Sequence, residues 1–214
     1  MPTPIYPPVR TFHARHGRLG PSARDAIERL LPLVDVGQRE APVNLRVLLP
    51  GRRIVIDFGS GMGQHALHLA QGGAGVLAID VHSPGIARLA LAAAPGIVLH
   101  LGDGVALLSH HLAAQCADEV HIMFPDPWPK ARHAKRRLIQ PSFLDVVARV
   151  LCPGGLVAVV TDDADYAAQA AAVIRDHPSF SRVDDPFRWQ PTRYHERAVR
   201  LGRDVHCLTA RVTG

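Results

Sequence analysis

The sequence predicts an α/β protein with a mostly parallel, twisted sheet, helices on both of its faces and an antiparallel C-terminal edge strand. Three observations support this prediction. Short apolar runs alternate with helical patterns along most of the chain. Several of these runs are apolar throughout, which is typical of strands covered on both faces. A last strand pattern, at 205–212, has no helix after it. The 214 residues are enough for one domain with a substantial core.

The expected elements follow one another from residue 23 onward. A short amphipathic helix is predicted over 23–33, and a strand or lead-in over 44–50, while the rest of 34–50 matches no pattern. The predicted strands cover 54–58, 76–80, 97–101, 120–124 and 156–161, and the helices that follow them cover 64–71, 84–94, 105–112, 140–150 and 165–175. This order predicts consecutive βαβ units.

The chain is expected to form a flexible basic N-terminal arm, residues 1–22, and a single domain over 23–214. The arm is rich in Pro, Arg and His and has no periodicity. Its first residues have no apolar stretch like that of a signal peptide, and no run is long enough to span a membrane. Three cysteines at distant positions, Cys116, Cys152 and Cys207, suit a reducing compartment. We therefore expect a cytoplasmic protein.

The net charge of +5 is unevenly distributed. Five positive charges lie between Lys130 and Arg137, with no acidic residue among them, and six arginines lie between Arg188 and Arg211. In contrast, residues 54–126 contain six acidic residues and one arginine. A polyanion bound beside a site for a cationic small molecule would produce this pattern. A basic surface that only contacts solvent is the alternative.

Four carboxylates follow four successive predicted strands: Asp57, Asp80, Asp103 and Asp126. A single aspartate after a strand usually caps the next helix. Because the carboxyl ends of parallel strands meet at one edge of a sheet, four such residues are expected to face one crevice. Asp80 is placed where a carboxylate accepts hydrogen bonds from ribose hydroxyls, and Asp103 where an adenine amino group can be met.

A glycine-rich turn, "DFGSGMG", follows the first of these strands. Gly59, Gly61 and Gly63 let the chain turn sharply and let a ligand approach the backbone, although a plain strand–helix turn is the alternative. The spacing differs from that of dinucleotide-binding folds, and the carboxylate of Asp57 would repel a pyrophosphate. A ligand with a positive charge and a ribose fits better, and S-adenosyl-L-methionine has both.

The sequence resembles the bacterial tRNA (guanine-N7)-methyltransferase family over roughly residues 10–212. The motifs that carry the resemblance are "DFGSGMG", "AIDVHSPG", "FPDPWPKARHAKRR", "VTDDADYA" and "TRYHERAVRLG". The family usually has Glu where this chain has Asp57 and Asp80. Its C-terminal motif usually reads T-x-F/Y-E, whereas here His195 takes the place of the glutamate and Glu196 follows one position later.

This resemblance implies a Rossmann-like class I methyltransferase that methylates a guanine in the variable region of tRNA. We expect Asp126 to be catalytic. The residues expected to bind the cofactor are Asp57, Gly59, Gly61, Asp80, Val81, Asp103, Gly104 and Asp126. The residues expected to bind tRNA are Lys130, Arg132, Lys135, Arg136, Asp162, Thr192, Tyr194, His195 and Glu196. Asp162 and Thr192 have simpler alternatives, as a helix cap and as the start of a turn.

The alternating prolines of "FPDPWP" fix the backbone around Asp126 and remove competing amide donors. Trp128 is expected either to line a pocket for a flipped base or to pack against the next helix. The cations from Lys130 to Arg137 are expected to meet phosphates. No histidine or cysteine spacing predicts a metal site.

Two other functions remain open from the sequence alone. One is a methyltransferase of the same fold that acts on another RNA or on a small molecule, which the basic run argues against. The other is an RNA-binding paralogue without catalysis, which the histidine at position 195 favours. The sequence is compatible with a monomer or a homodimer, without membrane or metal partners.

Overall fold

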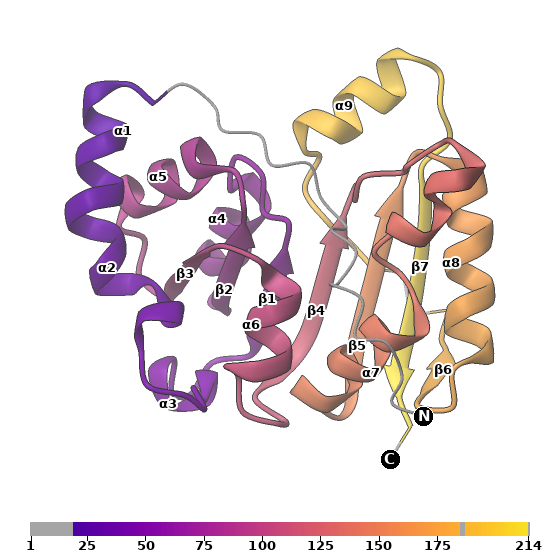
Figure 1. Ribbon diagram of the computed structural model, residues 1–214, viewed down its shortest axis with the longest axis horizontal. Helices are drawn as coiled ribbons and strands as arrows, with labels where there is room; N and C mark the ends of the chain where they lie inside the picture. The colour runs from indigo at the N-terminus through magenta and orange to yellow at the C-terminus, as the bar shows by residue number, and fades with distance from the viewer. Residues whose placement is uncertain (1–18, 185–186, 214) are drawn as a thin grey trace, which may run out of the picture.

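A seven-stranded sheet forms the centre of the computed structural model, which describes residues 19–184 and 187–213 (Figure 1). The strands are β1 (Ile54–Phe58), β2 (Gly75–Asp80), β3 (Ile97–Leu101), β4 (Ala117–Met123), β5 (Leu151–Thr161), β6 (Phe180–Arg182) and β7 (His206–Val212). Their order across the sheet is β3-β2-β1-β4-β5-β7-β6. The first five strands are parallel, and β7 is antiparallel to both β5 and β6.

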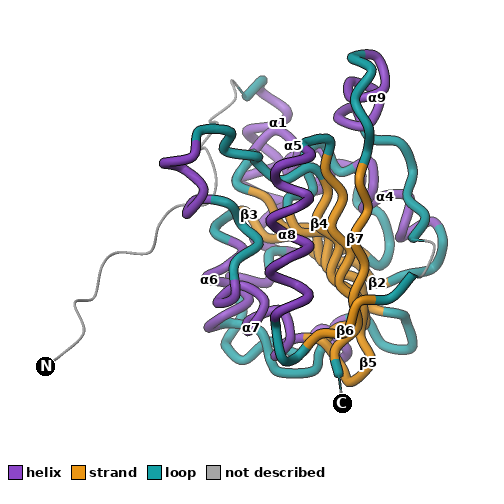
Figure 2. Tube along the Cα trace, turned by 90° about the vertical axis from the view of Figure 1, so that its right-hand side faces the viewer, coloured by secondary structure: helices purple, strands orange, loops and turns teal. Residues whose placement is uncertain are grey.

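Helices cover both faces of this sheet. The helices and helical turns are α1 (Pro21–Asp25), η1 (Ala26–Leu30), α2 (Leu31–Val34), η2 (Val36–Gln38), α3 (Leu45–Leu48), α4 (Gln64–Gln71), α5 (Ser83–Ala92), α6 (Gly104–His110), η3 (Ala131–Arg136), α7 (Pro141–Val150), α8 (Ala164–Asp176) and α9 (Arg193–Arg200). Figure 2 shows α6, α7 and α8 on one side of the strands and α4 on the other. The predicted α/β fold is confirmed.

Alternate side chains of β1, β2 and β3 enter two separate apolar clusters. Ile54 and Ile56 of β1 pack with residues of α6, α7 and α8, whereas Val55 packs with residues of α4 and α5. The period of two follows from the pleat of a strand, and both sets are buried because helices lie on both faces. This explains why β1 and β2 are apolar almost throughout.

The direction in which the chain crosses the sheet changes at β1. The strands β2 and β3 lie on one side of β1, and the chain then returns to add β4 on its other side. A crevice forms outside the carboxyl ends of the strands at such a switch point, and ligands bind there in open α/β sheets. The fold therefore positions a site next to the ends of β1 and β4.

The segment before β1 differs from the prediction. Residues 44–50, expected as a strand or lead-in, contain the short helix α3. The side chain of Asn44 accepts a hydrogen bond from the Arg46 amide at 3.0 Å, which caps the helix, and Leu45 is fully buried. The local cap and one apolar contact thus favour a helical turn where the apolar letters alone resemble a strand.

The part of the chain just after α2 is fixed by a buried carboxylate. Asp35 accepts a hydrogen bond from the Gly37 amide at 2.7 Å and another from Nδ1 of His100 at 3.0 Å. Val36 and Val43 are also buried. Asp35 therefore packs beside Leu99 of β3, and Val43 packs beside Leu112 after α6, in a segment for which no element is predicted from the sequence.

At the other end of the sheet the structure adds two elements that were not predicted. The three-residue strand β6 pairs outside β7, so the antiparallel edge consists of two strands. The helix α9 precedes β7 and lies beyond the carboxyl ends of β4 and β5 (Figure 1). The predicted arm falls mainly on residues 1–18, which lie outside the described residues, and α1 begins at Pro21.

Candidate active site

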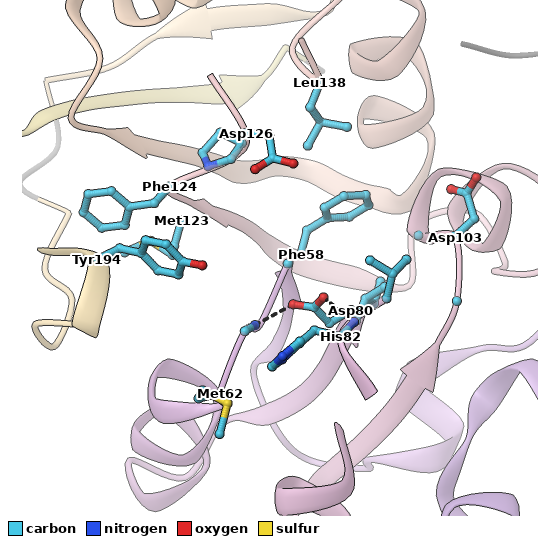
Figure 3. Close-up of a pocket in the computed structure, with 17 residues that line it drawn as sticks. Phe58, Met62, Asp80, His82, Asp103, Met123, Phe124, Asp126, Leu138 and Tyr194 are labelled. Atoms are coloured by element: carbon cyan, nitrogen blue, oxygen red, sulfur yellow. Dashed lines mark hydrogen bonds between the residues drawn. The ribbon is translucent and has the colours of Figure 1, made fainter. Parts of the chain in front are cut away.

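A cavity of about 240 Å³ lies at the carboxyl ends of the parallel strands (Figure 3). The ends of β1, β2, β3 and β4 contribute to its wall, and one residue comes from α9. The residues that line it are Phe58, Gly59, Gly61, Met62, Ile79, Asp80, Val81, His82, Gly102, Asp103, Gly104, Met123, Phe124, Pro125, Asp126, Leu138 and Tyr194. The structure therefore brings seven of the eight predicted cofactor residues, all except Asp57, to one cavity.

The glycine-rich turn after β1 leaves space for a ligand. Gly59 and Gly61 have φ values of +81° and +55°, which other residues rarely adopt, and no heavy atom lies within 4 Å of a β-carbon placed on either. The amides of Gly59 and Ser60 both donate to the carbonyl of Ile79 at 2.9 Å. These bonds fix the turn against β2, so its backbone forms a stable, open floor of the cavity.

Asp80 lies next to this turn, at the end of β2. One carboxylate oxygen accepts from the Gly61 amide at 2.6 Å and the other from the His82 amide at 2.8 Å. Burial raises the pKa of Asp80, and these two backbone hydrogen bonds oppose the effect. The bonds orient the carboxylate in the wall of the cavity, as the prediction of a ribose contact requires.

Asp57 is placed differently from the expectation. It is 1% exposed and is not among the described residues that line the cavity. Because strand side chains alternate, Asp57 points to the same face as Val55, under α4, while the backbone of Gly59 reaches the cavity. Neither carboxylate oxygen of Asp57 forms a hydrogen bond of ordinary geometry with a described residue. Burial, with a smaller contribution from Asp80, raises the pKa of Asp57 to about 7.

Asp103 both lines the cavity and caps a helix. One oxygen of its carboxylate accepts from the amides of Val105 and Ala106, at 2.9 and 3.3 Å, at the start of α6. At the next position, a β-carbon on Gly104 would lie 2.7 Å from the Phe58 ring. Asp103 therefore caps α6, as the helix-cap alternative predicts. The same capping hydrogen bonds hold its side chain at the edge of the cavity.

The proline-rich loop after β4 carries Asp126 into the cavity wall. Phe124 and Trp128, on either side of Asp126, have φ values of +51° and +46°, so the backbone turns sharply around the aspartate. The Phe124 amide donates to the Val160 carbonyl at 2.7 Å, which fixes the start of the loop to β5. Trp128 is buried and does not line the cavity. Of its two expected roles, the structure supports packing.

The basic run forms the 3₁₀ helix η3 and the residues beside it. Lys130, Arg132 and Lys135 are exposed, as expected for residues that meet phosphates. The guanidinium of Arg136 lies 4.6 Å from the centre of the Trp128 ring. The motif thus combines an exposed cationic surface with an indole that supports it.

Arg137 is a correction to the sequence analysis, which placed it among the phosphate contacts. It is 8% exposed, and its guanidinium donates to the carbonyls of Pro127 at 3.0 Å and Asp165 at 3.3 Å. It also lies 5.4 Å from the Tyr166 ring centre. Its donors are directed into the protein, so Arg137 connects the Asp126 loop to α8.

The predicted C-terminal residues lie on or near α9. Thr192 caps this helix by accepting from the His195 amide at 3.3 Å. Tyr194 is half-exposed, stacks on Phe124 with ring centres 6.2 Å apart, and is the one residue of this group that lines the cavity. Glu196 is exposed, and Asp162 forms an ion pair with Arg203 at 2.8 Å.

His195 occupies an aromatic environment. Its ring meets the rings of Phe124 and Trp189 edge to face, with centres 6.4 and 5.9 Å apart. Its Nδ1 atom is buried and has no hydrogen-bond partner among the described residues. His195 is not among the residues that line the cavity, and its ring packs against Phe124, which does line it; its predicted contact with substrate stays a prediction.

The sequence analysis missed several residues of the cavity wall. Met62 and His82 directly adjoin predicted residues, Phe124 stands two residues before Asp126, and Leu138 follows the basic run. Met62 stands inside the glycine motif, and Phe124 opens the proline motif, so both positions could be predicted from their motifs. Leu138 has no local signal, because only the return of the chain after η3 brings it to the cavity.

The cavity is suited to a cationic ligand with polar substituents. Its described lining contains three carboxylates, those of Asp80, Asp103 and Asp126, and no lysine or arginine. Among residues 19–184 and 187–213, no three His, Cys, Asp or Glu side chains are grouped as metal ligands. In the same part of the chain no helix is long and apolar enough to cross a membrane.

Comparisons with known proteins agree on the fold and on the family. A family model described as "Putative methyltransferase" matches residues 51–208. Among solved structures, the 16S rRNA methyltransferase KamB has a TM-score of 0.58 at 18% identity, covering 84% of this chain and 99% of that one. The aminoglycoside resistance methyltransferase NpmB1 has a TM-score of 0.56 at 18% identity, with coverage of 84% and 98%. At this identity the structural likeness concerns the fold alone.

Curated relatives are more similar in sequence. The tRNA (guanine-N(7)-)-methyltransferase of Nitrosospira multiformis is 35% identical, over 92% of each chain. The protein of the same name from Halorhodospira halophila is 37% identical, over 95% of each chain. With such identity over nearly its whole length, and with the family model over most of it, the chain belongs to the tRNA (guanine-N(7)-)-methyltransferase family.

Proposed function

We propose that this protein transfers the methyl group of S-adenosyl-L-methionine to N7 of a guanine in the variable region of tRNA. The observation that carries the proposal is the cavity itself. It combines three carboxylates with an open glycine turn, and the loop that supplies Asp126 continues directly into the exposed cations of η3. A small cationic ligand and a polyanion can therefore be held side by side.

The residues of the cavity fit S-adenosyl-L-methionine. The open space over Gly59 and Gly61 would admit its methionine part against the backbone. The two oxygens of Asp80 are oriented by backbone amides and retain lone pairs for two ribose hydroxyls. Gly104 and Asp103 at the start of α6, with Val81 and His82 after β2, would surround the adenine.

Asp126 is proposed as the catalytic residue. Guanine N7 has a lone pair and no proton, so methylation there requires no general base. The protein must instead align the base with the methyl donor and stabilise the positive charge that develops on the purine. A carboxylate held at the cavity wall can do both, because it also accepts hydrogen bonds from N1–H and N2–H₂ of guanine.

When bound, S-adenosyl-L-methionine supplies an electrophilic methyl group on a positively charged sulfur. The side chains of Tyr194 and Phe124 would enclose the base, since they line the cavity beside Asp126. Lys130, Arg132, Lys135 and Arg136 would bind phosphates near the flipped nucleotide. Asp162, Thr192, His195 and Glu196, on or near α9, are proposed as further substrate contacts beside Tyr194.

The organisation of the working protein is part of the same proposal. We infer one catalytic domain over residues 23–214 and a basic arm over 1–22 that contributes to RNA binding. A tRNA substrate supports a cytoplasmic location. The protein is proposed to act as a monomer or a homodimer.

Methylation of bulk tRNA tests this proposal. The protein is incubated with S-adenosyl-L-methionine and tRNA from cells that lack the modification, and the RNA is then digested to nucleosides. We expect 7-methylguanosine as the product. A different methylated nucleoside would favour the alternative methyltransferase. Tight tRNA binding without any methylated nucleoside would favour a binding protein that has lost catalysis.

A further inference from the structure

The helix α9 carries a row of arginines that the site described above does not use. Arg193, Arg197 and Arg200 are spaced four and three residues apart, which places them on one face of the helix. All three are exposed, and none forms an ion pair with a described residue. Together they form the arginine row of α9.

The rest of the helix fixes the direction of this row. Ala198 is fully buried, and the ring of His195 contacts Phe124 and Trp189, so the opposite side of α9 packs on the protein. The arginine row therefore faces solvent. The carboxylate of Asp162 is already paired with Arg203. Within α9 itself, Glu196 is the one acidic residue.

The helix α9 also contributes a residue to the cavity wall, so the arginine row begins close to the cavity. Tyr194 lines the cavity and directly follows Arg193 in the chain. At a rise of 1.5 Å per residue, the row extends over about 10 Å from Arg193 to Arg200. The cations therefore begin at the mouth of the cavity and continue away from it along one line.

A row of this length matches a nucleic-acid backbone. Each strand of a duplex carries one phosphate per about 3.4 Å of rise, so about 10 Å corresponds to two or three phosphates. Arginine also suits the contact, because its planar fork binds phosphate oxygens in pairs. In the cavity wall, Tyr194 of α9 lies apart from Leu138 (Figure 3). The cations of η3 stand between Asp126 and Leu138 in the chain, so they adjoin a different part of the wall from α9.

We propose that the arginine row of α9 is a second RNA-binding surface, which binds backbone phosphates on the side of the target nucleotide opposite to η3. The RNA is then held on both sides of the extruded guanosine, and the base between the two contacts is directed at the cavity. This inference rests on the proposed function, since its occupant is the RNA substrate. It assigns RNA binding to three arginines of the motif "TRYHERAVRLG" that are not among the residues predicted to bind tRNA.

The test removes the row and measures how RNA binding depends on salt. A triple variant, Arg193→Ala, Arg197→Ala and Arg200→Ala, is compared with the parent by titration of tRNA at several salt concentrations. The matched control is Arg29→Ala, Arg175→Ala and Arg182→Ala, which removes the same charge from sites paired with nearby aspartates. In the control, Arg175 and Arg182 belong to α8 and β6, away from the cavity.

We expect the row variant to bind tRNA about 10–100-fold more weakly at moderate salt and to lose about 2–3 from the log–log salt slope, while the control keeps the parent slope. Replacing the three arginines by lysine should restore most of the slope, because a charge remains at each position. Affinity for S-adenosyl-L-methionine, measured by calorimetry, should be the same in all variants.

An unchanged salt slope in the alanine variant would overturn the inference, and so would an equal loss in the control. These outcomes are distinguishable from a failure of the proposed function. If the parent methylates tRNA and the slope does not change, only the α9 surface is wrong. If the parent gives no 7-methylguanosine and the slope falls, the surface stands as an RNA contact and the proposed activity is wrong.

Discussion

Asp57 has an environment that opposes its charge. It is fully enclosed beneath the glycine turn, its oxygens lack hydrogen bonds of ordinary geometry, and Asp80 adds a second negative charge nearby. Burial is the main reason why its pKa rises from 3.8 to about 7. The folded protein therefore holds this proton at pH values where the unfolded chain has released it.

This shift predicts a pH-dependent contribution to stability. Between pH 4 and 7 unfolding releases the Asp57 proton, so raising the pH favours the unfolded state, and the effect is complete above pH 7. Asp57→Asn removes this dependence. We expect the variant to gain about 3 kcal/mol of unfolding free energy relative to the parent between pH 5 and pH 8, at 1.36 kcal/mol per pH unit.

Urea unfolding of both proteins across this pH range measures the difference directly. The comparison cancels the contributions of other titrating groups, because they are shared. The difference should grow up to about pH 7 and then level off. A difference that stays constant from pH 5 to pH 8 would mean that Asp57 is ionised in the folded protein throughout this range.

At the scale of elements, the cavity depends on how closely α5 packs against the glycine turn. A β-carbon on Gly85 of α5 would lie 1.7 Å from the carbonyl oxygen of Gly61, a backbone atom that has no room to move without shifting the turn. The absence of a side chain at Gly85 therefore sets the height of the cavity floor. Nothing in the local sequence marks this role, because the neighbour belongs to another element.

We expect Gly85→Ala to displace the turn and to weaken binding of S-adenosyl-L-methionine at least tenfold, about 1.4 kcal/mol, with some loss of stability from overpacking. The matched control is Gly20→Ala, since Gly20 has an ordinary φ of −71° and no atom within 4 Å of an added β-carbon. Calorimetric titration with the cofactor measures both. Equal affinities in a folded Gly85→Ala protein would contradict the role assigned to this packing.

The elements that the sequence predicts well are the strands that are covered by helices on both faces of the sheet. In β1 and β2 the apolar run is continuous, so length and composition suffice to identify the strands. The helix α9 has the opposite character: it buries Ala198 alone, and most of its surface is charged. An apolar period cannot reveal such a helix, and β6, with three residues, is too short to show a period.

The same reasoning explains the predicted site. Asp80, Asp103 and Asp126 were identified because each follows a strand, and the parallel sheet brings strand ends together. Asp57 lies outside the cavity lining because the face to which its side chain points depends on the phase of the strand, and the apolar residues on both sides of it do not define that phase. The roles of Arg137 and His195 depend on partners far along the chain, Asp165 and Phe124 among them, and no local pattern contains these contacts.

Over the whole molecule, opposite charges are separated in a way that fits two ligands. The carboxylates lie at the cavity, at the switch point of the sheet, while the exposed cations of η3 and α9 lie beside it. In the proposed function, the acidic cavity would attract the cationic cofactor, and the basic surfaces would attract RNA phosphates and raise the rate of encounter. Asp126 stands where the two regions meet, since its loop continues into η3.

The central claim is that Asp126 stabilises the charge that develops on guanine during methyl transfer. Asp126→Asn keeps the size of the side chain but removes its charge and replaces one acceptor by a donor that faces the guanine donors. Since this interaction is made mainly in the transition state, we expect the rate to fall by about 10²–10³-fold. Affinity for tRNA should change far less, because phosphate contacts supply most of it.

Single-turnover methylation of tRNA at saturating S-adenosyl-L-methionine, with parent and Asp126→Asn proteins side by side, is the most direct measurement. Binding titrations at the same salt concentration separate a loss of rate from a loss of affinity. We expect the large fall in rate with nearly unchanged tRNA affinity. A variant within about threefold of the parent rate, a difference under about 1 kcal/mol, would show that another group carries this role.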